Sequence, residues 1–262
     1  MNRINHNIED IGIFINKKIV YLGGLAILIK HIIKDIKNKP VLTKELKEQC
    51  LSIGVASLPI ALITVFFVGV VFAFQFGFTL RALGAVQFIG RVTSVSLIRE
   101  LGPVFTALVV GGRIGAGISA EIGSMKVTEQ LDAIYALGAN PINKLIVPRI
   151  IATTLMLPLV TIIATFMGEL GALFISFYEF GLSPVSFYGT SVSTVRMFDL
   201  ISGLTKTFFF GFGISLVGCY EGLNCQLGTK AVGIATTKAV VNVSLVIVFV
   251  DFFLTRLFAF FL

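Results

Sequence analysis

The sequence predicts an all-α polytopic membrane protein with an N-terminal interfacial amphipathic helix, five transmembrane helices and a short cytoplasmic helix. Of its 262 residues, 56% are hydrophobic and only 13% are charged, about half the charged fraction of a soluble domain. Apolar runs long enough to span a bilayer recur five times. Little chain remains outside them, so we expect an amphipathic arm over 1–50, one membrane domain over 51–262 and no separate catalytic domain.

The N-terminal arm is basic and periodically apolar. Nine of the 21 Lys and Arg residues precede residue 50, which favours a cytoplasmic N-terminus. Within 8–37 the longest stretch without charge is 19–29, which is too short for a span of about 20 residues. We therefore expect an interfacial helix with Lys17, Lys18, Lys30 and Lys34 reaching lipid headgroups. A six-span alternative would make 11–30 a crossing, against which Lys17 and Lys18 argue. Binding to lipid headgroups also explains the basic arm more simply than binding to nucleic acid does.

The five predicted spans alternate with four short loops. The spans cover about 52–79, 92–120, 145–178, 199–220 and 233–261. With the N-terminus inside, two loops lie in the cytoplasm, at 121–144 and 221–232. The other two lie outside, at 80–91 and 179–198, and the C-terminus also ends outside.

Charged residues interrupt two of these spans. Arg99 and Glu100 precede Gly102-Pro103, where proline frees a carbonyl and bends the helix. A charge beside a helix break is typical of a polar cavity or gate, because intramembrane charge is costly; a structural pair near the outer interface is the alternative. Asp251 is the second embedded acid, and a structural hydrogen-bond or ion-pair anchor between helices, for example to Arg256 one turn away, explains it as well as direct function does.

The small-residue run from Gly111 to Gly117 serves helix packing. It lacks the Gly-x-x-x-x-Gly-Lys-Ser/Thr pattern of a phosphate-binding loop, which occurs nowhere in the chain. Gly111 and Gly115 form a Gly-x-x-x-Gly face that lets helices approach closely. The chain therefore carries no nucleotide-hydrolysing motif of its own.

The polar segment 126–137 predicts a short amphipathic helix in a cytoplasmic loop. Ser124 is a plausible N-cap, Gly138 a plausible C-terminal stop, and Asn140-Pro141 prevents continuation. Such a helix suits docking into a partner's groove, with a position on the membrane surface as the alternative. One apolar face combines Val127, Leu131, Ile134 and Tyr135.

Several of these motifs together resemble the MlaE family of ABC-transporter permeases, which includes plastid lipid-import permeases. The resemblance covers nearly the whole chain after about residue 10. The motifs that match the family are Arg99-Glu100-Leu101-Gly102-Pro103, Gly112-Arg113-Ile114-Gly115-Ala116-Gly117, Ala120-Glu121-Ile122-Gly123-Ser124-Met125, Thr128-Glu129-Gln130-Leu131-Asp132-Ala133, Ala139-Asn140-Pro141 and Asp251-Phe252-Phe253-Leu254-Thr255.

The resemblance implies a homodimeric permease that moves phospholipid between the inner membrane and the outer envelope. It implies two copies of a separate ATPase, which bind ATP for the complex, and a periplasmic ring of lipid-binding MCE-domain subunits. Neither a bound cofactor, a metal nor nucleic acid is expected on this chain. The implied location is a bacterial inner membrane, with a plastid inner envelope as the alternative.

The resemblance also assigns residues to roles. Arg99 and Glu100 match charged positions near the lipid cavity, and the end of the first span matches its apolar wall, at Phe72, Phe76 and Leu80. The ATPase-coupling helix matches a set comprising Lys126, Glu129, Gln130, Leu131, Asp132 and Tyr135. Gly111, Gly115 and Asp251 are expected to be structural residues within the membrane.

Three other classes of function remain open from the residues alone. An ion-coupled secondary transporter would use Glu100 and Asp251 as proton carriers. A non-transporting scaffold would tolerate neutralisation of Glu100. An intramembrane enzyme is least favoured, because the histidines, His6 and His31, both lie in the arm and no catalytic or metal-ligand cluster is visible.

Overall fold

The helices account for nearly all of the chain. The computed structural model describes residues 2–38 and 43–261, and its regular elements there are all helical. Five helical segments are long and apolar enough to cross a membrane, which confirms the five predicted spans. These segments are Thr43–Ala82, Val86–Val127, Ile142–Phe180, Met197–Leu223 and Thr229–Phe258. They begin two to nine residues before the predicted spans, because helices continue past the apolar stretch, and the first takes in the end of the predicted arm.

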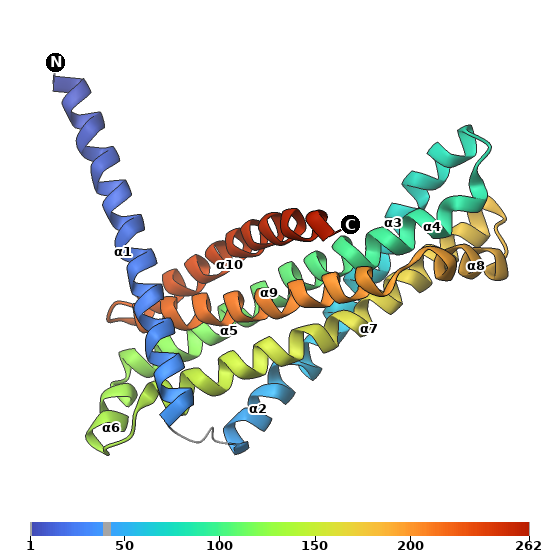
Figure 1. The fold of residues 1–262 in the computed structure, drawn as a ribbon. Helices are drawn as coiled ribbons and strands as arrows, with labels where there is room; N and C mark the ends of the chain where they lie inside the picture. Colours follow the sequence, from blue (N-terminus) through green and yellow to red (C-terminus); the bar gives the residue numbers. More distant parts are fainter. Residues whose placement is uncertain (1, 39–42, 262) are drawn as a thin grey trace.

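The N-terminal helix α1 (Asn2–Asn38) lies across one end of the bundle (Figure 1). It is not one of the five candidate spans. Leu28 and Ile32 are buried against the bundle, whereas Lys30 and Lys34 are exposed. The side chains of Lys17 and Lys18 lie outside the described part. This arrangement fits an interfacial helix rather than a sixth crossing.

Two polar contacts attach α1 to the rest of the molecule. Asn140 Nδ2 donates to Asp35 Oδ2 at 2.6 Å. Further along, the Tyr21 hydroxyl accepts from Asn242 Nδ2 at 3.3 Å, and the same amide donates to Glu221 at 2.7 Å. Burial, and then the charge of Glu221, raises the pKa of Tyr21, so the phenol stays neutral at physiological pH.

The first span consists of α2 (Thr43–Ile53) and α3 (Leu58–Ala82). The buried face of α3 repeats every fourth residue with mostly small side chains: Ala61, Val65, Gly69, Ala73 and Gly77. This face packs on α7 (Val147–Phe180). A Cβ on Gly69 would lie 2.0 Å from the carbonyl oxygen of Gly168, so the two backbones touch there and only glycine fits.

The second span is interrupted by a π-helical turn. It runs from α4 (Ile89–Ser96) through the π turn Leu97–Leu101 into α5 (Gly102–Val127). The break expected at Gly102-Pro103 is therefore this turn, and α5 starts directly after it. Because π turns are frequent at functional sites, the turn focuses attention on Arg99 and Glu100.

The remaining helices complete the bundle around α5. Helix α9 (Met197–Leu223) and helix α10 (Thr229–Phe258) both pack on α5. Between α7 and α9 the predicted outside loop contains a helix, α8 (Pro184–Thr194), capped by Ser183 Oγ, which accepts from the Ser186 amide at 3.2 Å.

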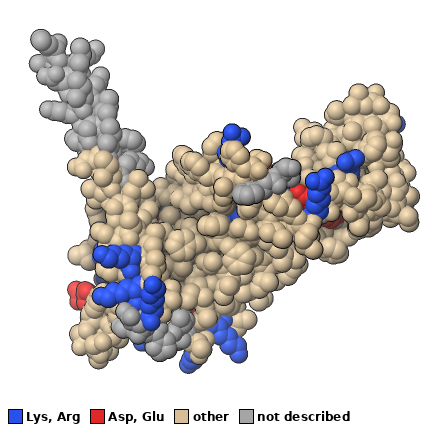
Figure 2. Space-filling model, in the orientation of Figure 1, with Lys and Arg blue, Asp and Glu red and all other residues tan. Residues whose placement is uncertain are grey.

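The two ends of the bundle differ. Helices α1, α2 and α6 (Gln130–Ala136) lie at one end, and α4 and α8 at the other (Figure 1). Basic side chains gather at the end that carries α1 and α6 (Figure 2). The predicted orientation places this basic end at the cytoplasmic surface.

Candidate functional site

The π turn directs two neighbouring charged side chains at α9. Arg99 Nε lies 3.3 Å from Asp199 Oδ1, and Glu100 Oε2 contacts Lys206 Nζ. Asp199 also accepts from the backbone N–H of Arg196 at 3.0 Å, which caps α9. The alternative interpretation paired Arg99 and Glu100 structurally, whereas each of them is paired with a residue of α9.

Lys206 is the centre of the charged site. Its side chain is 1% exposed, and its Nζ contacts Glu100, Asp251 Oδ1 at 3.1 Å and Thr255 Oγ1 at 2.6 Å. We call these four residues the Lys206 cluster. The cluster joins the second, fourth and fifth spans through one ammonium group.

The charges of the Lys206 cluster do not cancel. One ammonium faces two carboxylates, so the fully ionised cluster carries one net negative charge. Buried ions cost several kcal/mol each unless partners compensate them. Each ion here has an opposite charge in contact, which explains how the cluster persists at membrane depth.

Asp251 forms an ion pair between two helices. It contacts Lys206 on α9 and not Arg256 on its own helix. The guanidinium of Arg256 lies 5.1 Å from the ring centre of Phe260, a cation–π distance. The sequence reasoning missed Lys206, although a lysine within an apolar run is itself a legible signal.

An apolar cavity of about 570 Å³, which we call the α3 cavity, lies between α3 and the start of α5. Phe72 lines it together with Phe67, and Leu101 of the π turn closes its other side. Two other residues expected at this wall do not line it. Phe76 packs on Phe72 with ring centres 4.5 Å apart, and Leu80 packs into a separate core cluster.

The cytoplasmic helix starts later than predicted. Helix α5 continues to Val127, so Ser124 is not a cap, and α6 begins after Glu129, whose φ of 58° is left-handed. Lys126 belongs to α5, where its Nζ donates to the Leu223 carbonyl at 2.5 Å.

Helix α6 exposes only part of its expected docking face. Leu131 is 8% exposed and packs into the protein's own core. Tyr135 is 58% exposed and the neighbouring Leu137 is 85% exposed. Three polar residues, Glu129, Gln130 and Asp132, are exposed beside them. The surface that α6 and its neighbours expose at this end of the molecule therefore combines aromatic and acidic side chains.

Gly111 and Gly115 lie where α5 meets its neighbours most closely. A Cβ on Gly111 would lie 2.8 Å from Ile214, and one on Gly115 would lie 2.8 Å from Val243. Both distances are shorter than ordinary van der Waals contact, so the glycines allow α9 and α10 to pack on α5. Among the described residues no group of three His, Cys, Asp or Glu side chains could hold a metal ion.

Comparison with known proteins shows to which family the chain belongs. The sequence model described as Permease MlaE matches residues 46–257. A probable ABC transporter permease protein of Rickettsia typhi is 40% identical over 236 residues, 90% of this chain and 91% of the relative. One from Synechocystis sp. is 45% identical, covering 90% and 88%. One from Pyropia yezoensis is 35% identical, covering 84% of each. The chain is a multi-pass membrane protein that belongs to the MlaE family of ABC transporter permeases.

Proposed function

We propose that this permease moves phospholipid between the inner membrane and the outer envelope as a homodimer driven by a separate ATPase. The observation that carries the proposal is the π turn. Its Glu100 joins the Lys206 cluster, while its Leu101 lines the open apolar cavity. A charged group beside an apolar cavity suits a molecule with a charged head and acyl chains.

Arg99 adds a donor for an anionic headgroup. Its Nε is used by Asp199, but its Nη2 is buried and has no hydrogen-bond partner within the described residues. Guanidinium groups bind phosphate through paired N–H donors. A phospholipid phosphate would satisfy this donor.

The partners follow from family membership and the exposed α6. An ABC permease works with an ATPase, and α6 with Tyr135 and Leu137 offers a docking surface at the predicted cytoplasmic end. At the opposite end, α4 and α8 would face an MCE-domain subunit. The location that fits is a bacterial inner membrane, with a plastid envelope as the alternative.

The test is ATP-dependent lipid transfer by the reconstituted complex. Arg99→Ala and Glu100→Gln should each lower transfer about tenfold or more, since hydrogen bonds to charged groups are worth about 1.5–3 kcal/mol, with less effect on assembly. Arg91→Ala is the matched control, because Arg91 is exposed on α4. Transfer at the wild-type rate by both site variants would contradict the proposal.

The same assay distinguishes ATP-driven transport from the alternative function, ion-coupled secondary transport. An ion-coupled transporter would work with a proton gradient and no ATPase. The geometry disfavours it, because both candidate proton carriers, Glu100 and Asp251, are held by Lys206. Transfer without ATP that follows the proton gradient would favour that alternative.

A further inference from the structure

Helix α7 carries an acidic residue, Glu169, that the Lys206 cluster and the α3 cavity do not use. Its Oε2 accepts from Ser94 Oγ at 2.7 Å. Its Oε1 is buried and has no hydrogen-bond partner in the described part of the chain. No Lys, Arg or His side chain described here forms an ion pair with it, whereas Glu100, Asp199 and Asp251 each have one.

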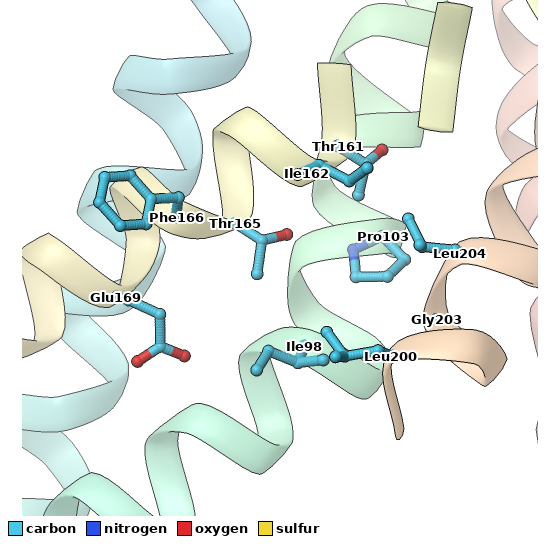
Figure 3. Close-up of a pocket in the computed structure, with 10 residues that line it drawn as sticks. All are labelled: Ile98, Pro103, Thr161, Ile162, Thr165, Phe166, Glu169, Leu200, Gly203 and Leu204. Atoms are coloured by element: carbon cyan, nitrogen blue, oxygen red, sulfur yellow. The ribbon is translucent and has the colours of Figure 1, made fainter. Parts of the chain in front are cut away.

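Glu169 lies at the junction of two cavities. The first, of about 220 Å³, lies between α7, α9 and the π turn, and the Glu169 carboxylate lines it near Ile98 and Thr165 (Figure 3). The second, of about 340 Å³, lies on the α8 side. Both cavities share Ile98, Glu169 and Leu200. Neither shares a lining residue with the α3 cavity.

The entrances to these cavities are apolar. Ile162 and Phe166 of α7 are 50% and 60% exposed, and Val192 of α8 is 75% exposed. On the membrane-spanning helix α7 such side chains contact acyl chains. A molecule that reaches Glu169 past Ile162 and Phe166 therefore enters from the bilayer and is itself largely apolar.

Glu169 is near headgroup level on the predicted outer side. It precedes the end of α7 at Phe180 by 11 residues, or about 16 Å. The whole span Ile142–Phe180 has 39 residues, a length of about 58 Å against a hydrocarbon layer of about 30 Å. If the excess is divided equally, about 14 Å of helix projects beyond that layer at each end, which places the carboxylate close to the boundary with the headgroups.

Two serines hold the carboxylate in place. Ser94 Oγ also lies 2.8 Å from Ser191 Oγ, whose single proton is donated either to Ser94 or to the Phe187 carbonyl at 2.9 Å. Helices α4 and α8 thus fix one carboxylate oxygen and leave the other without a donor, at a residue that lines both cavities. A buried acceptor without a donor is unfavourable, more so when it is charged, so a ligand that supplies a donor is stabilised there.

We propose that Glu169 binds the ammonium group of an amine-bearing phospholipid, whose acyl chains occupy the adjoining cavities. The ammonium supplies both the missing donor and the missing positive charge. This site is separate from the α3 cavity, and it requires only that the chain spans a membrane, not that phospholipid is the transported molecule.

The first experiment uses the wild-type permease in lipid nanodiscs. Phosphatidylethanolamine and phosphatidylglycerol with identical photoreactive acyl chains are crosslinked, and the labelled peptides are mapped. Labelling around Ile162 and Phe166 should be about tenfold stronger with phosphatidylethanolamine, the effect of one charge-assisted contact. Equal labelling by the two lipids would overturn the proposal.

A pair of variants then tests the carboxylate itself. Glu169→Gln keeps the size and the bond from Ser94 but removes the charge, and should abolish the lipid preference. Glu179→Gln, at an exposed position on the same helix, should keep it. Persistence of the preference in Glu169→Gln would refute the assignment.

Labelling near Phe72 serves as the internal reference. It reports the α3 cavity of the proposed transport path and should not change in Glu169→Gln. If the wild type is labelled at Ile162 and Phe166 but not near Phe72, the result counts against the proposed transport path and supports the Glu169 site.

Discussion

Lys206 compensates two acids that come from different spans. Lys206→Met would leave Glu100 and Asp251 in contact with no cation. Removing one partner of a buried ion pair costs about 3–5 kcal/mol. We expect a lower unfolding temperature in detergent and lower yield from membranes.

Controls for this variant are available within the chain. Lys230→Met, at an exposed position in α10, should unfold as the wild type does. Adding Glu100→Gln and Asp251→Asn to Lys206→Met should restore much of the loss, because uncharged groups replace the uncompensated acids. A Lys206→Met permease as stable as the wild type would show that the cluster contributes nothing to stability.

Individual residues show what sequence reasoning can and cannot reach. The embedded positions of Glu100 and Asp251 were legible because charge within an apolar run is costly. Their pairing with Lys206 was not, since Lys206 lies more than 40 residues from each and pairing depends on how the spans pack. Glu169 escaped notice for a related reason: its two cavities exist only once α7, α8 and α9 are assembled.

At the scale of elements, the crossing of α3 and α7 depends on Gly69. Gly69→Ala would place a methyl group 2.0 Å from the Gly168 carbonyl oxygen. Overpacking of this kind costs about 1–3 kcal/mol, so the unfolding temperature should fall. Gly233→Ala is the matched helix control, since a Cβ there meets nothing within 4 Å, and it should be neutral or slightly stabilising. Equal stability of the two variants would contradict the close crossing.

Two residues of α6 should respond differently to substitution, one in ATPase binding and the other in stability of the permease. Tyr135→Asp should weaken copurification of the ATPase about tenfold or more, as loss of an exposed aromatic anchor does, and leave the permease folded. Leu131→Asp should instead destabilise the permease, because Leu131 is buried. Tyr178→Asp, at the opposite end and 71% exposed, is the control and should retain the ATPase. Full ATPase recovery with Tyr135→Asp would exclude α6 as its docking element.

The elements themselves were predictable to different degrees. Apolar length alone located all five spans. The helix α8 was missed because its serine- and threonine-rich sequence resembles a loop. The start of α6 was misplaced because Ser124 is a good cap by type, yet packing against α9 and α10 lets α5 continue through it.

For the whole molecule, the orientation in the membrane is directly testable. Leu137 and Val185 lie at opposite ends and are 85% and 84% exposed. Leu137→Cys should react with a membrane-impermeant maleimide only from the cytoplasmic side, and Val185→Cys only from outside. The wild type gives the background, in which Cys219 and Cys225 are buried. The opposite labelling pattern would invert the predicted topology.

The π turn has a consequence for any one-residue change in its neighbourhood. A π turn holds one residue more than the same stretch of α-helix, and it ends directly before Gly102. Deleting one residue from Leu97–Leu101 would let α4 and α5 merge into a plain helix. Everything upstream would keep nearly its present orientation relative to α5, because five residues of a π turn rotate about as far as four residues of an α-helix. Only the residues of the turn itself would be displaced, so a single excess residue sets the positions of Glu100 and Ile98 and thereby affects both sites at once.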